Sequence, residues 1–161
     1  MKLVFSNRQR HLPLHRPALR RLTARLLARA LRNRPPPQWA EIAVLVVDDA
    51  GMRAMHRACF GREAATDTIA LAYPPFPPGA SDWRGEIAVN AERAARAWRY
   101  RGSPGRELAL YLAHGCDHLD GADDATPADR ARMRRRENRW LRGAEERALA
   151  DQLTRGAPDR A

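Results

Sequence analysis

Apolar residues recur at helical spacing in the segment that follows Pro17. The positions that share one face of this predicted helix are Leu19, Leu22, Leu26 and Ala30. Arginines occupy the opposite face. This amphipathic pattern predicts a helix that buries its leucines and exposes its arginines to solvent. The apolar residues 2–5 before it predict a short strand.

Three further apolar runs are typical of β-strands rather than helices, because they are short and contain β-branched residues. They cover residues 41–47, 68–73 and 85–90. Asp48 and Asp49 directly after the first run favour a helix start, and the helix should extend to about Phe60. Asn90 at the end of the third run is placed to cap another helix, beginning at Ala91.

The C-terminal third of the chain predicts two helices. The first covers residues 107–119, and its core-facing stripe consists of Leu108, Tyr111, Leu112 and Cys116. Thr126 and Pro127 are typical of a helix start, so the second helix should begin there and continue to about Ala148. The pattern predicts a single α+β domain over residues 1–155, a small mixed sheet packed by helices, with a frayed tail at 156–161.

The chain is strongly basic. Its 161 residues include 29 lysines and arginines against 19 acids, which gives a net charge of +10, and the sole lysine is Lys2. Polyanions concentrate at such a surface, so nucleic acid is the expected class of partner. The length and the apolar fraction of 44% suit one globular domain with a real core.

The two cysteines and the apolar runs limit the compartment and the partners. Cys59 and Cys116 are too few for a disulfide framework and lack the spacing of a metal knuckle. No apolar run is long enough for a signal peptide or a membrane span. We therefore expect a cytoplasmic protein without a membrane partner.

The strongest chemical signal is a pair of histidines followed by acids. His114 and His118 are four residues apart, so both imidazoles lie on one face of the predicted helix. A helix end at Gly121 would let the chain fold back and bring Asp123 or Asp124 to the same point. Two histidines and one carboxylate leave a position open for water, which is the pattern of a catalytic zinc site.

Gly115 narrows the class of hydrolase. In His-Glu-x-x-His peptidases a glutamate follows the first histidine and serves as general base. Glycine occupies that position here, so a peptidase is disfavoured. A pair of histidines at this spacing also occurs by chance on helix surfaces, and the neighbouring blocks of sequence therefore decide its meaning.

Those blocks resemble the bacterial YbeY endoribonucleases, metal-dependent enzymes of rRNA maturation, whose motif reads His-Gly-x-Leu-His-Leu-x-Gly-Tyr-Asp-His. The residues of this chain that match the motif in register are His114, Gly115, His118, Leu119, Gly121 and Asp123. Residues 66–71 are similar to the family's Thr-Asp-Val-Leu-Ser-Phe strand, and residues 85–89 to its Gly-Asp-Ile-Val-Ile strand. The resemblance covers roughly residues 40–145.

The resemblance implies the ligands of the metal. One zinc ion per chain is expected on His114, His118 and Asp124, where Asp124 stands in place of the family's third histidine. The family's arginine upstream of the Thr-Asp block falls at Phe60. Arg62 aligns with a family lysine two residues further on, and we expect it to stabilise charge on the phosphate as the catalytic arginine.

Two acids within the motif are candidates for a supporting role. Asp117 replaces the family's leucine, and Asp120 lies one residue before Gly121. Metal-bound imidazoles donate their second N–H to a carboxylate or a carbonyl. Either aspartate could supply that carboxylate.

The resemblance predicts a single-strand-specific endoribonuclease that acts in ribosomal RNA maturation and ribosome quality control. Its expected partners are single-stranded RNA, ribosomal RNA and proteins of the small ribosomal subunit. The replaced histidine and Phe60 favour an alternative, a metal-binding module for RNA or ribosome assembly with little nuclease activity. A third reading, a metal-dependent hydrolase of small substrates, predicts activity that salt does not weaken.

Overall fold

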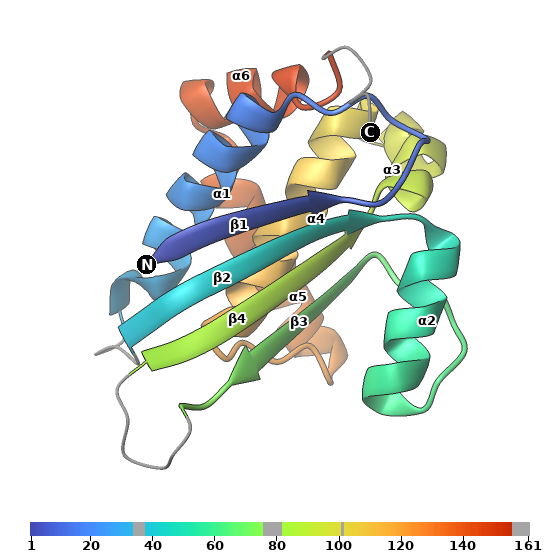
Figure 1. Cartoon of the computed structure of the whole chain (residues 1–161). Coiled ribbons are helices and arrows are strands. Elements are labelled where there is room, and N and C mark those ends of the chain that lie inside the picture. The colour runs from blue at the N-terminus through green and yellow to red at the C-terminus, as the bar shows by residue number, and fades with distance from the viewer. Residues whose placement is uncertain (34–37, 76–81, 101, 156–161) are drawn as a thin grey trace.

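The computed structural model describes residues 1–33, 38–75, 82–100 and 102–155 (Figure 1). Its strands are β1 (Lys2–Asn7), β2 (Gln38–Val47), β3 (Thr68–Tyr73) and β4 (Asp82–Asn90). Its α-helices are α1 (Arg16–Ala30), α2 (Asp49–Phe60), α3 (Ala91–Ala97), α4 (Pro104–Leu119), α5 (Pro127–Trp140) and α6 (Ala144–Gln152). The short 3₁₀ helices are η1 (Leu31–Asn33) and η2 (Trp98–Tyr100). The tail at 156–161, which the sequence predicts to be frayed, lies outside the described residues.

The strands form one mixed sheet in the order β1-β2-β4-β3. β1, β2 and β4 are parallel, whereas β3 lies at the edge and is antiparallel to β4. The expectation of an α+β fold with a small mixed sheet is therefore confirmed. Strand β3 matches its predicted bounds, and β4 begins three residues earlier than predicted.

The two faces of the sheet are covered unequally (Figure 1). Alternate residues of β2 point to opposite faces, as they do in any strand. Ile42, Val44 and Val46 join the large core with α1, α4 and α6. Val47 joins a smaller cluster on the other face with Met52 of α2. The main core thus lies between the sheet and the helices that carry the histidine motif.

The starts of the helices follow from their capping residues. Asp48 accepts a hydrogen bond from the amide of Gly51, and Asn90 accepts one from the amide of Arg93, as predicted. Helix α4 begins three residues before the predicted Glu107. The reason is that the Ser103 hydroxyl accepts from the Arg106 amide, and Pro104 suits the first turn.

The prediction of one uninterrupted helix from Thr126 to about Ala148 is wrong. The chain leaves α5 after Trp140 and begins α6 at Ala144. Gly143 separates them, and a Cβ there would lie only 2.0 Å from the carboxylate of Glu146. The carboxylate of Glu146 binds arginines of α1, so tertiary contacts set the direction of α6.

No helix among the described residues combines the length and the apolar character that crossing a bilayer requires.

Candidate metal centre

The last turn of α4 and the loop after it place three side chains around one point. His114 and His118 lie one helical turn apart on α4. The helix ends at Leu119, and Gly121 adopts a left-handed φ of +83° that turns the chain back. Asp124 follows on this returning segment. The predicted break at Gly121 is thus confirmed.

The distances within this cluster suit a shared cation. The Nε2 atoms of His114 and His118 are 3.1 Å apart. An oxygen of Asp124 lies 3.8 Å from Nε2 of His114. One ligand atom from each of the three residues lies within 4.8 Å of the others. These residues could therefore hold a metal ion.

The other nitrogen of each imidazole is held by an acceptor. Nδ1 of His118 lies 2.9 Å from the backbone oxygen of Ala122, and Nδ1 of His114 lies 2.6 Å from the carboxylate of Glu137. A carbonyl oxygen only accepts, so Nδ1 of His118 donates to Ala122. The Glu137 carboxylate offers Nδ1 of His114 an acceptor in the same way. With Nδ1 as the donor in each ring, both Nε2 atoms can offer lone pairs, and their separation of 3.1 Å suits a metal ion bound by both.

The surroundings of His114 favour positive charge. Burial by itself lowers the pKa of this imidazole, but the hydrogen bond and the charge of Glu137 raise it more, and Asp67 and Asp124 contribute in the same direction. The net effect is a pKa above the usual value of histidine. A negative potential that stabilises an imidazolium also stabilises a metal cation.

The structure distinguishes the two acids that the sequence left open. Asp123 turns to its own loop, where its carboxylate accepts a hydrogen bond from the amide of Ala125. Asp124 faces the histidines with 41% of its side chain exposed. Arg130 donates to the backbone oxygen of Asp124 at 2.8 Å and thereby fixes the loop from α5. Asp124 is the acid that the fold brings to the cluster.

The expectation for Asp117 is wrong. Its carboxylate is fully buried and binds Arg136 of α5 at 2.5 and 2.9 Å, away from the imidazoles. The carboxylate that holds an imidazole belongs instead to Glu137, within the helix that the sequence predicts to begin at Thr126. The sequence contained a signal for the burial of Glu137, because this residue lies four positions after the apolar Met133 and so shares its helix face. Both side chains are buried in the structure.

A pocket of about 350 Å³ opens beside the cluster. Besides the three candidate ligands, its lining includes His56 and Phe60 of α2, and Thr66 and Asp67 before β3. Asp67 accepts hydrogen bonds from the Thr68 amide and the Thr66 hydroxyl, so its carboxylate has a fixed position. The pocket is large enough to admit a substrate group to the candidate ligands.

The predicted catalytic arginine, Arg62, is not among the residues that line this pocket. Arg62 is exposed in the segment between α2 and β3, and the side chain from this end of α2 that lines the pocket is Phe60, with 51% exposure. Arg57, on the last turn of α2, forms an ion pair with Glu63 at 3.0 Å. The role of Arg62 stays a prediction.

The structure explains why position 115 is a glycine, which the sequence alone did not show. A Cβ at this position would meet Cγ2 of Ile87 at 2.5 Å and the hydroxyl of Thr68 at 3.1 Å. Only glycine lets α4 lie this close to β3 and β4. The close approach brings the two histidines to the edge of the pocket.

Fold and site together define a class: a small α+β protein with a His-His-Asp cluster suited to a metal at the end of a core helix. The model of the family "Endoribonuclease YbeY" matches residues 4–145 of the chain. This chain therefore belongs to the YbeY endoribonuclease family.

Individual relatives agree with this assignment. The chain is 40% identical over 123 residues to the Endoribonuclease YbeY of Anaeromyxobacter sp. (strain Fw109-5), a match that covers 76% of this chain and 62% of the relative. It is 32% identical over 152 residues to that of Moorella thermoacetica, covering 89% and 97% of the two chains. The solution structure of TM1509 from Thermotoga maritima is similar in fold, with a TM-score of 0.56, 16% identity and 99% coverage of both chains.

Proposed function

We propose that this chain is a single-strand-specific, metal-dependent endoribonuclease that acts in ribosomal RNA maturation and ribosome quality control. Single-stranded RNA, ribosomal RNA and proteins of the small ribosomal subunit are its proposed partners, and the cytoplasm is its proposed location. Membership of the endoribonuclease family supports the reaction class, and the net charge of +10 supports a polyanionic substrate.

The observation that carries the proposal is the orientation of the two imidazoles. Both Nδ1 atoms are tied to acceptors, so both Nε2 lone pairs point to one place beside the Asp124 carboxylate. His114, His118 and Asp124 are the proposed ligands of one zinc ion per chain. Zinc bound in such a site supplies a Lewis acid for phosphoryl oxygens and lowers the pKa of water.

The protein's own residues orient the two imidazoles and reduce the positive charge of the proposed metal site. Glu137 and the Ala122 carbonyl fix the two imidazole rings, which keeps the ligand geometry from relaxing. The Asp124 carboxylate reduces the positive charge at the cluster compared with a third histidine. The pocket beside the cluster, which Thr66 and Asp67 also line, is the proposed place where the RNA backbone binds.

Arg62 is proposed to contact a phosphate of the RNA at the rim of this pocket. It lies two residues after Phe60 on an exposed segment. The Arg62→Ala variant is expected to cleave RNA at least tenfold more slowly while keeping its metal, since one charged contact to a phosphate is removed. Unchanged cleavage by Arg62→Ala removes this residue from the proposal.

Metal content and RNA cleavage, measured together, test the function. Purified protein is expected to contain about one zinc per chain, the His118→Ala variant is expected to lose it, and His114→Ala is expected to lose cleavage of single-stranded RNA. The matched control is His11→Ala, which removes an exposed imidazole from the segment after β1. Metal-free protein that still cleaves RNA contradicts the proposal.

The second candidate function is a metal-binding module for RNA or ribosome assembly. The observation that favours it is Phe60, which lines the pocket at the place of the family's arginine. The same assay separates the two functions. Bound zinc combined with equal RNA cleavage by wild type and His114→Ala indicates a contaminating nuclease and supports the binding module.

A further inference from the structure

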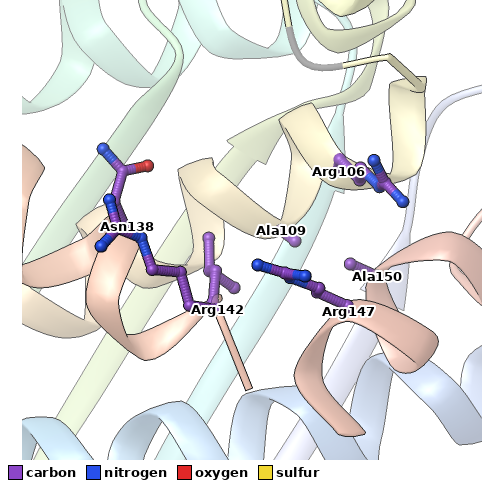
Figure 2. Close-up of a pocket in the computed structure, with 7 residues that line it drawn as sticks. Arg106, Ala109, Asn138, Arg142, Arg147 and Ala150 are labelled. Atoms are coloured by element: carbon purple, nitrogen blue, oxygen red, sulfur yellow. The ribbon is translucent and has the colours of Figure 1, made fainter. Parts of the chain in front are cut away.

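A second pocket of about 420 Å³ lies between α4, α5 and α6 (Figure 2). Its polar lining is contributed by Arg106, Asn138, Arg142 and Arg147. Ala109 of α4 and Ala150 of α6 lie between Arg106 and Arg147 and present little side chain, which leaves room between the guanidinium groups. The candidate metal cluster takes no part in this pocket.

The positive charge of this pocket is neutralised only in part. Arg106 binds the carboxylate of Asp151 with two hydrogen bonds, at 2.7 and 3.0 Å. Arg142 and Arg147 are both exposed, and among the described residues neither has a carboxylate at ion-pair distance. Two guanidinium groups are therefore available to an anion that enters from solvent.

The acids of α6 are engaged with other helices. Glu145 pairs with Arg25 at 2.9 Å, and the buried Glu146 binds Arg25 and Arg29 of α1 at 2.7 and 2.6 Å. These contacts turn the acidic side of α6 toward α1. Arg147, one residue further on, is left on the side that faces α4 and α5.

The walls of the pocket have fixed positions. A Cβ on Gly105 would lie 2.3 Å from the backbone oxygen of Ala150, so α4 and α6 touch through their backbones. The Arg106–Asp151 pair joins the same two helices. A rigid frame reduces the entropy lost when a ligand is bound.

We propose that this pocket binds phosphate groups of the RNA strand whose cleavage is proposed above; the identity of the ligand rests on that proposed function. Guanidinium groups bind phosphate oxygens through paired N–H donors, and the Asn138 amide supplies polar groups beside them. The volume is sufficient for a nucleotide-sized group. The pocket thus acts as a second contact for the strand, outside the candidate metal centre.

The position of the pocket suits an extended strand. α5 passes both sites, because Glu137 contacts His114 and the next residue, Asn138, lines the second pocket. Arg106 and His114 are eight residues apart on α4, which corresponds to about 12 Å along the helix axis. The separation along the helix is short enough for one RNA strand that is proposed to contact both sites, and Arg135 and Arg139 are further exposed arginines of α5.

Equilibrium binding of a labelled single-stranded polyuridine oligonucleotide to the full chain tests the proposal. The measurement uses chelator to prevent cleavage and follows the Kd over a series of salt concentrations. The Arg142→Ala/Arg147→Ala double variant is expected to raise the Kd about tenfold or more. Loss of two phosphate contacts should also reduce the slope of log K against log salt by about 1.4.

A charge-matched variant controls for the net charge. Arg10→Ala/Arg53→Ala removes the same charge from the loop after β1 and from α2, and both side chains are exposed. It is expected to change the Kd less than threefold. All variants lie at exposed positions, and thermal unfolding verifies that each is folded.

The outcomes separate this inference from the proposed function. If the wild type cleaves RNA and the double variant binds the oligonucleotide as the wild type does, only the second site is wrong. If the wild type neither binds nor cleaves RNA, both proposals fail. Competition arms with inorganic phosphate and with polyglutamate identify other ligands, and a pocket that binds either of them while leaving RNA affinity unchanged on substitution overturns the inference.

Discussion

The two imidazoles of the candidate metal centre differ in the acceptor that holds them. His114 is tied to the carboxylate of Glu137 on α5, whereas His118 is tied to the backbone oxygen of Ala122 in its own loop. A carboxylate adds negative charge and a carbonyl does not. His114 is therefore the proposed ligand whose properties depend on another helix, and Glu137 is the residue to test.

Replacement of the Glu137 carboxylate by an amide of the same shape should weaken metal binding. The Glu137→Gln variant is expected to bind zinc 10- to 100-fold more weakly, because such supporting partners typically contribute that much. Chelator competition measures the affinity. Glu63→Gln, at an exposed position in the segment after α2, is the matched control. Equal zinc affinity in all three proteins contradicts the orienting role.

The third ligand can be tested with neighbouring residues. Asp124→Ala is expected to lose zinc, whereas Asp123→Ala is expected to retain it, because only Asp124 faces the histidines. Asp124→His should also retain zinc, since imidazole is a ligand of similar reach. Metal analysis of the three purified variants is sufficient. Retention of zinc by Asp124→Ala together with its loss from Asp123→Ala reverses the assignment.

At the scale of elements, α4 carries the histidines of the candidate metal centre, packs against the sheet and lines the second pocket. Its glycines mark the two close approaches of this helix: Gly115 touches Ile87 of β4, and Gly105 touches the backbone of Ala150 in α6. Its buried side includes Leu108, Leu112 and Cys116. The position of the histidines is consequently set by backbone packing as well as by the helical spacing.

A methyl group at position 115 should separate α4 from the sheet. Gly115→Ala is expected to lower the free energy of unfolding by about 1–3 kcal/mol, because the new Cβ collides with Ile87. Urea denaturation measures the loss. Adding Ile87→Ala removes the colliding atom, so the double variant is expected to lose less than the sum of the two single variants. Full additivity argues against the contact.

The docking of α6 onto α1 should depend on pH. Burial raises the pKa of Glu146, but hydrogen bonds and charges from Arg25 and Arg29 lower it more, so the folded-state pKa lies below the ordinary value. The resulting stabilisation is fully present above the unfolded-state pKa and is lost as the pH falls through the folded-state pKa. Unfolding free energies measured below about pH 5 are expected to fall more steeply in wild type than in Glu146→Gln. Parallel curves contradict this role of Glu146.

At the scale of the whole molecule, positive charge dominates the surface. The net charge of +10 arises almost entirely from arginine, and α4 contributes lining residues to both pockets. One contains the His-His-Asp cluster and the other contains uncompensated guanidinium groups. This arrangement suits the proposal that an RNA strand binds at the second pocket and is cleaved at the candidate metal centre.

RNA binding by the wild type should therefore weaken strongly with salt. The logarithm of the association constant is expected to fall linearly with the logarithm of the salt concentration, because each phosphate contact releases counterions. Fluorescence anisotropy with single-stranded RNA measures this slope. Hydrolysis of a small phosphodiester by the same protein is the control. RNA cleavage as insensitive to salt as that control favours a hydrolase of small substrates.

The sequence determined the elements and the chemistry of the site. Short apolar runs located the strands, and the helical period of 3.6 residues together with capping residues located most of the helices, because burial of one helix face follows directly from this period. The spacing of His114 and His118 and the glycine at 121 predicted their convergence with an acid. The choice between Asp123 and Asp124 depended on the loop conformation, which residue order does not encode.

Only the tertiary structure decided which distant residues support the site. Glu137 reaches His114 because α5 packs against α4. Asp117 of α4 lies away from the imidazoles because it pairs with Arg136 of α5. Ion pairs join α6 to α1 after the break at Gly143, and residues on both sides of the break line the arginine pocket. Spacing along the chain determines what shares a face of one element, whereas contacts between elements depend on how those faces are brought together.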